Sequence, residues 1–74
     1  MNDLKTIGLE IKKNVPSKKE LLSQNPSFKL DSFDLKTECY KIDNNEGEIL
    51  TVVFDIEGNM YNVLYTTYYI NIEK

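Results

Sequence analysis

The sequence predicts a small α+β domain, in which one or two N-terminal helices pack on a three-stranded antiparallel β-meander. Two β-rich runs near the C-terminus, residues 49–56 and 60–70, are separated by a short turn sequence. The N-terminal part instead shows helical periodicity and a capping box, which supplies a second layer. At 74 residues the chain is expected to form one domain, with a helical part at 1–25 and the sheet at 35–72.

The first segment, residues 3–13, fits two patterns. Leu4, Ile7 and Ile11 fall on one helical face, whereas Ile7, Leu9 and Ile11 also alternate with polar residues as in a strand. A glycine in the middle would cost a helix about 1 kcal/mol relative to alanine. We favour a helix, because Asn2 or Asp3 could serve as its N-cap and two lysines suit its C-terminus.

The second helix is predicted over residues 18–24. Ser17 and Glu20 have the spacing of a capping box, in which each side chain accepts a hydrogen bond from the backbone of the other. Pro26 stops the helix, since the residue before a proline is pushed out of helical geometry. Two turns are too few to be stable alone, so its leucines are expected to pack on a core.

The strands follow from alternation and turn chemistry. Residues 27–34 alternate weakly and are expected to form a loop or a short edge strand. The segment Asp55-Ile56-Glu57-Gly58 fits a type I turn that ends in a glycine of positive φ. The predicted strands are residues 35–42, 48–55 and 59–70, with a turn at 43–47.

The turn sets the expected register between the last two strands. If Asp55 opposes Asn59, then Phe54 faces Met60 and every later pair follows with a period of two. The expected pairs on the core side are Phe54 with Met60, Val52 with Asn62 and Leu50 with Leu64, and those on the outer side are Val53 with Tyr61, Thr51 with Val63 and Ile49 with Tyr65.

The outer sheet face is the predicted partner-binding surface. A chain of this length can cover one face with its own helices, so the other must meet solvent, a second copy or a partner. Tyrosine is enriched in protein interfaces and can also stack on bases of single-stranded nucleic acid. The predicted partner-binding residues are Tyr61, Val63, Tyr65, Tyr69, Ile49 and Val53.

The charge is uneven along the chain. Residues 1–41 carry eight lysines against six acidic residues, whereas residues 42–74 carry one lysine against six. An acidic sheet attracts a basic protein surface and repels a phosphate backbone, which argues against nucleic acid. The four lysines around Pro16 form a small basic cluster, which we interpret as a solvated surface.

The sequence gives little support for catalysis or for cofactor binding. The chain has no His and no Arg, and its one thiol, Cys39, has no His to activate it. The three glycines are too far apart for a phosphate loop, and the acidic turn at Asp43 lacks the spacing of a calcium loop. We therefore predict no catalytic, cofactor-binding or metal-ligating residue, and the sequence resembles no family whose motifs we could quote.

The location follows from what the sequence lacks. It shows no basic region followed by an apolar run at Met1, and no stretch of about 20 apolar residues. A single cysteine is typical of a reducing compartment, so a cytoplasmic protein is expected. The abundance of Lys, Asn, Ile and Tyr is typical of an AT-rich genome, such as that of a low-GC bacterium or its phage. Together with the small size, it suits a phage or mobile-element product.

The predicted function is a small non-enzymatic interaction module. It would act as a regulator or inhibitor that binds a larger, basic protein through the aromatic sheet face or a strand edge. Two alternatives stay open: a structural homo-oligomer such as a dimer, and a single-stranded nucleic-acid binder that uses the tyrosine ladder.

Overall fold

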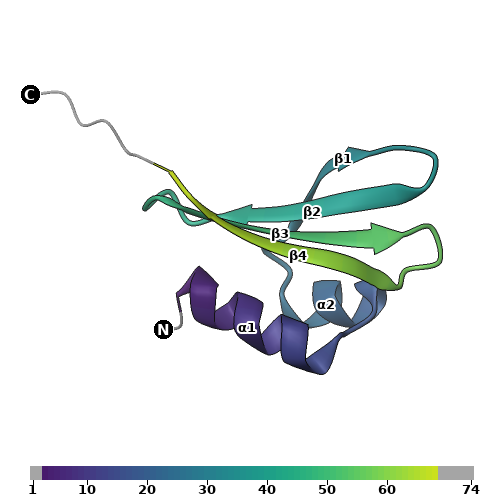
Figure 1. Ribbon diagram of the computed structural model, residues 1–74, viewed down its shortest axis with the longest axis horizontal. Coiled ribbons are helices and arrows are strands. Elements are labelled where there is room, and N and C mark those ends of the chain that lie inside the picture. Colours follow the sequence, from purple (N-terminus) through teal and green to yellow (C-terminus); the bar gives the residue numbers. More distant parts are fainter. Residues whose placement is uncertain (1–2, 69–74) are drawn as a thin grey trace, which may run out of the picture.

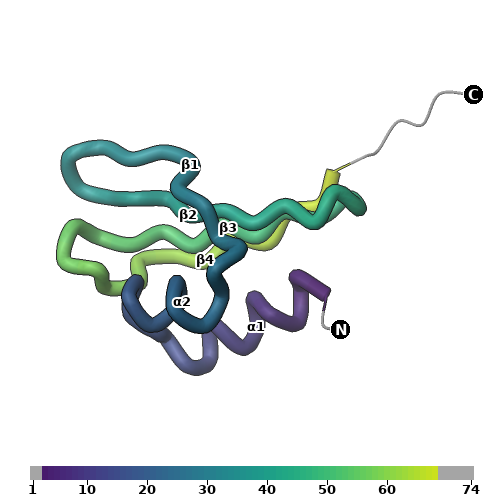
Figure 2. The backbone as a smooth tube through the Cα atoms, turned by 180° about the vertical axis from the view of Figure 1, so that it is seen from behind, coloured from purple at the N-terminus to yellow at the C-terminus, as the bar shows by residue number. Residues whose placement is uncertain are grey.

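The computed structural model, which describes residues 3–68, is a two-layer α+β domain (Figure 1). The sheet is an antiparallel meander with strand order β1-β2-β3-β4, and both helices lie on the same side of it (Figures 1 and 2). The predicted fold class is confirmed, with four strands instead of three because residues 29–33 pair with the next strand. The elements are α1 (Leu4–Asn14), α2 (Lys18–Gln24), β1 (Lys29–Phe33), β2 (Thr37–Asp43), β3 (Glu48–Asp55) and β4 (Met60–Thr67).

Helix α1 confirms the helical interpretation of the first segment. The Asp3 carboxylate caps it by accepting a hydrogen bond from the Thr6 N–H at 2.8 Å, which lowers the pKa of Asp3. The helix ends at Val15, whose φ of 47° is left-handed and whose N–H donates to the Ile11 carbonyl. Within residues 3–68, neither helix is long and apolar enough to cross a membrane.

Helix α2 begins at the predicted capping box. The Ser17 hydroxyl accepts a hydrogen bond from the Glu20 N–H, and the Glu20 carboxylate accepts one from the Ser17 N–H. The Lys18 N–H donates to the Gly58 carbonyl at 2.8 Å, which joins the start of α2 to the turn between β3 and β4. Leu21 then points into the core and is fully buried.

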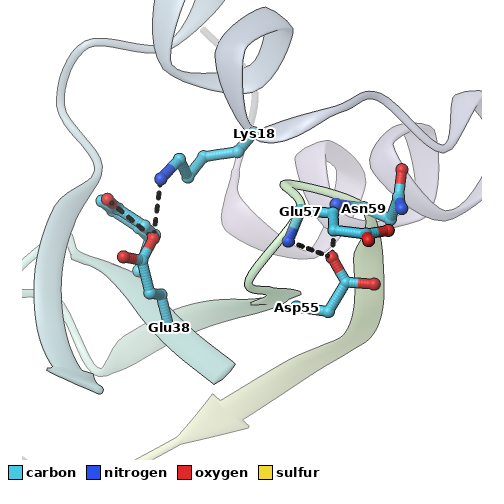
Figure 3. A network of polar contacts seen from close by, with 6 residues as sticks. Lys18, Glu38, Asp55, Glu57 and Asn59 are labelled. Atoms are coloured by element: carbon cyan, nitrogen blue, oxygen red, sulfur yellow. Dashed lines mark hydrogen bonds and ion pairs between the residues drawn. The ribbon is translucent and has the colours of Figure 1, made fainter. Parts of the chain in front are cut away.

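Lys18 also joins α2 to β2. Its Nζ lies 2.7 Å from a carboxylate oxygen of Glu38 (Figure 3). The same Nζ lies 6.0 Å from the ring centroid of Tyr40, which packs edge-on against Phe54. Because both members of the ion pair are about one third exposed, its main effect is to position α2 over the sheet and not to add much stability.

The turn between β3 and β4 has the predicted chemistry. The Asp55 carboxylate accepts hydrogen bonds from the N–H groups of Glu57 and Asn59, both at 2.9 Å (Figure 3). The Gly58 N–H donates to the Asp55 carbonyl, and Gly58 has a φ of 85°. Phe54 therefore faces Met60, as predicted from the turn.

The predicted register is wrong beyond this turn, because β4 contains a bulge. Between the pairs Phe54–Met60 and Val53–Asn62, β4 holds one extra residue, Tyr61, which β3 does not match. The extra residue moves every later side chain of β4 to the opposite face. Val63 lies opposite Val52 instead of Thr51, and Tyr65 lies opposite Leu50 instead of Ile49.

The core lies between the helices and one face of the sheet. Its centre is β3, where Leu50, Val52 and Phe54 are fully buried. The prediction is wrong for Asn62 and Leu64, which were expected on the core side. The bulge turns both outward, and Val63 and Tyr65 take their positions opposite Val52 and Leu50. The buried apolar residues are Leu4, Ile11, Leu21, Phe28, Leu50, Val52, Phe54 and Val63.

Candidate functional site

The face of the sheet opposite the helices is open within the described residues (Figure 1). On β3 the buried residues alternate with Ile49, Thr51 and Val53, which therefore point away from the helices. All three are half-buried, because neighbouring strands shield them on both sides. Strand β3, one of the two inner strands of the sheet, thus presents two aliphatic side chains to this face.

Leu64 extends this apolar surface onto β4. It lies directly opposite Thr51 and diagonally beside Ile49 and Val53, at a spacing where side chains of one face interact. Its side chain is 48% exposed. We call Ile49, Thr51, Val53 and Leu64 together the open strip.

Strands β1 and β2 make the other side of this face more polar. Cys39 lies opposite Val53 on β2 and is half-buried. Further along β2, the Lys41 ammonium lies 3.1 Å from the Asp31 carboxylate, which belongs to β1. The charges of Lys41 and Asp31 cancel, so this border of the open strip carries no net charge from the pair.

Acidic turns stand at both ends of β3. At one end the Asp43 carboxylate accepts hydrogen bonds from the Asn45 N–H and the Tyr68 hydroxyl, and these lower the pKa of Asp43. At the other end Asp55 and Glu57 lie in the turn that leads to β4. The open strip is therefore bracketed by negative charge along the direction of β3.

The predicted partner-binding residues that the structure describes do not all lie on one face of the sheet. Ile49 and Val53 lie on the open face as predicted, whereas Val63 is 5% exposed and belongs to the core. Tyr65 also faces the helices, and its hydroxyl donates a hydrogen bond to the Glu48 carboxylate, which raises the pKa of Tyr65 to about 12. Tyr61 is 73% exposed, so within the described residues no exposed ladder joins the two tyrosines. Tyr69 lies outside the described residues.

Sequence reasoning missed Leu64, but a signal for it was present. In the unbulged register the amide of Asn62 would enter the core opposite Val52, where a polar group without a partner is costly. The bulge places Asn62 on the open face and brings the apolar Val63 into the core instead. The free-energy cost of burying the Asn62 amide therefore favours the register with the bulge.

The remaining side chains offer little for metal chemistry. Within residues 3–68, no three Cys, Asp or Glu side chains converge as ligands of a metal ion would. Comparison of the chain with protein-family models, with curated proteins and with solved structures gives no match.

Proposed function

We propose that this protein is a small non-enzymatic interaction module that binds a larger protein through the open strip. The single observation that carries the proposal is the two-layer architecture, in which both helices cover one face of the sheet (Figure 2). The other face presents Ile49, Val53 and Leu64 beside one another. An apolar centre with a polar surround is the usual anatomy of a protein interface.

Charge indicates what kind of partner fits. β3 has eight residues and therefore spans about 26 Å, with an acidic turn at each end. A partner with an apolar patch flanked by basic side chains would match both the open strip and these turns. We infer a regulator or inhibitor of a basic protein, acting in the cytoplasm, where the Cys39 thiol stays reduced.

The experiment compares capture from a native lysate by two variants that add the same charge. Val53→Lys with Leu64→Lys places two ammonium groups on the open strip. Val15→Lys with Leu35→Lys places two on exposed apolar positions elsewhere, where the side chains are 58% and 93% exposed.

We expect one basic protein to be retained by the unaltered chain and by the control, and to be lost from the open-strip variant. Circular dichroism of both variants serves as the check that they are folded. If all three chains retain the same set of proteins, the open strip is not the binding surface and the proposal fails.

A further inference from the structure

Strand β4 is an edge strand without charge. It has a neighbour only on its β3 side within the described residues, and none of its residues, Met60–Thr67, is charged. Edge strands are normally protected by charged residues, by proline or by a bulge. β1, at the opposite edge, carries Lys29 and Asp31 and has a bulge near its middle. The bulge in β4 lies at its start, so residues 62–67 form a regular, unprotected edge.

The backbone of this edge is ready to pair with another strand. The Val63 N–H donates a hydrogen bond to the side-chain oxygen of Asn62 at 2.9 Å and does not pair with β3. N–H groups alternate between the two sides of an edge strand, so those of Tyr65 and Thr67 also point away from β3. The N–H of Tyr68, the residue after Thr67, points the other way and donates to the carbonyl of Gly47, which directly precedes β3. Tyr65 and Thr67 thus offer two free N–H donors to an added strand, whereas the Val63 N–H is already bound by Asn62.

A groove runs beside this edge, between β4 and α1. Helix α1 passes under β4 in the opposite direction (Figure 1). The groove has a volume of about 180 Å³, and since a cavity of about 150 Å³ holds benzene, it has room for one aliphatic side chain. Its lining residues are Lys5, Gly8, Leu9, Lys12, Val63 and Tyr65.

Leu9 and two lysines give the groove its chemistry. Leu9 is 59% exposed, although it is a large aliphatic side chain. Lys5 and Lys12 stand on either side of it, about 10 Å apart along the helix axis, and neither is ion-paired with a described carboxylate. In an extended peptide, side chains four residues apart share a face and lie about 13 Å from each other. Two flexible lysines can therefore reach two acidic side chains that flank one aliphatic side chain.

We propose that β4 and α1 together bind an extended peptide segment with the pattern acidic–x–aliphatic–x–acidic, which adds to the sheet as a fifth strand. Main-chain hydrogen bonds to the edge of β4 give affinity, and the groove selects the aliphatic side chain, as in other strand-addition complexes. This site is separate from the open strip and does not depend on it. The acidic segment is also opposite in charge to the partner inferred for the open strip.

The probe is the blocked peptide acetyl-Thr-Glu-Thr-Val-Thr-Glu-Thr-amide, titrated into the full chain at low salt and followed by amide NMR shifts. We expect the largest shifts in residues 62–67 and in α1. Lys12→Glu should weaken binding about tenfold, since it replaces an attractive exposed charge pair with a repulsive one. Lys13→Glu is the matched control, because it makes the same change in the same helical turn but does not line the groove.

Two methylated peptides test strand addition itself. In an antiparallel pairing, a residue whose side chain enters the groove donates its own N–H to β4. Methylation of the valine nitrogen should therefore abolish binding, whereas methylation of the following threonine nitrogen should preserve it. Equal affinity of the two peptides, equal weakening by both lysine variants, or shifts confined to the open face would overturn the proposal. So would a dimer paired through β4 that the peptide does not displace.

Discussion

Gly8 provides the sharpest test of how α1 packs on the sheet. A Cβ atom added at Gly8 would lie 2.9 Å from Cδ1 of Leu50, closer than packed carbons approach. Leu50 is fully buried, so this methyl group has no open space to enter. Gly8→Ala gains about 1 kcal/mol of helix propensity and loses about 1–3 kcal/mol to overpacking. We expect the variant to be less stable than the unaltered chain by up to about 2 kcal/mol.

The assay is urea unfolding followed by circular dichroism, in a double-mutant cycle with Leu50→Val. Valine has no Cδ atom, so it removes the atom that Ala at this position would meet. On the Leu50→Val background, Gly8→Ala should therefore stabilise the protein, by up to about 1 kcal/mol of helix propensity. The coupling energy between the two positions should equal the overpacking cost, about 1–3 kcal/mol.

The total stability of a chain of this size, about 4–11 kcal/mol, leaves room for both single variants to stay folded. If Gly8→Ala stabilises the unaltered chain by the full helix propensity, the close contact with Leu50 does not exist. The reasoning about helix placement would then be refuted, because it rests on that contact.

Three further predictions test the register, the partly buried hydrogen bond between Tyr65 and Glu48, and a helix cap. Val63→Thr should lower the free energy of unfolding in urea by about 1–3 kcal/mol, since it buries a hydroxyl, whereas Leu64→Thr should lower it by less than about 1 kcal/mol. A larger loss for Leu64→Thr than for Val63→Thr would instead support the register without a bulge. Tyr65 should titrate near pH 12 in ultraviolet absorbance, and Glu48→Gln should lower the pKa of Tyr65. Because the pKa in the folded protein exceeds the ordinary 10.0, the free energy of unfolding should fall as pH rises from 10 to 12. Titration of Tyr65 at the ordinary pKa would contradict the hydrogen bond to Glu48. Ser17→Ala should lower the free energy of unfolding by about 1 kcal/mol, and an unchanged urea midpoint would exclude a contribution from the capping box.

The elements of this fold could be predicted because each is specified by local chemistry. The capping box at Ser17, the proline at 26 and the Asp55–Gly58 turn act over four residues or fewer, so their effects can be inferred without a structure. β1 was left open between a loop and a strand. All five of its residues are exposed, so no burial pattern distinguishes them.

The site could be predicted only in part, because it depends on a register that one residue changes. Tyr61 is unmatched in the ladder, and it moves Val63 and Tyr65 to the helical face and Leu64 to the open face. Ile49 and Val53 were predicted on the right face, since β3 is regular and its alternation is complete. The groove under β4 could not be predicted, because it depends on where α1 lies relative to the edge of the sheet.

The most direct measurement is the molar mass in solution, by light scattering across a concentration series. We expect 8.6 kDa at every concentration, because under the proposed function the open strip binds a different protein and stays uncovered in the isolated chain. A species of twice this mass that Leu64→Lys dissociates would contradict the central claim. It would show that a second copy of this chain occupies the open strip.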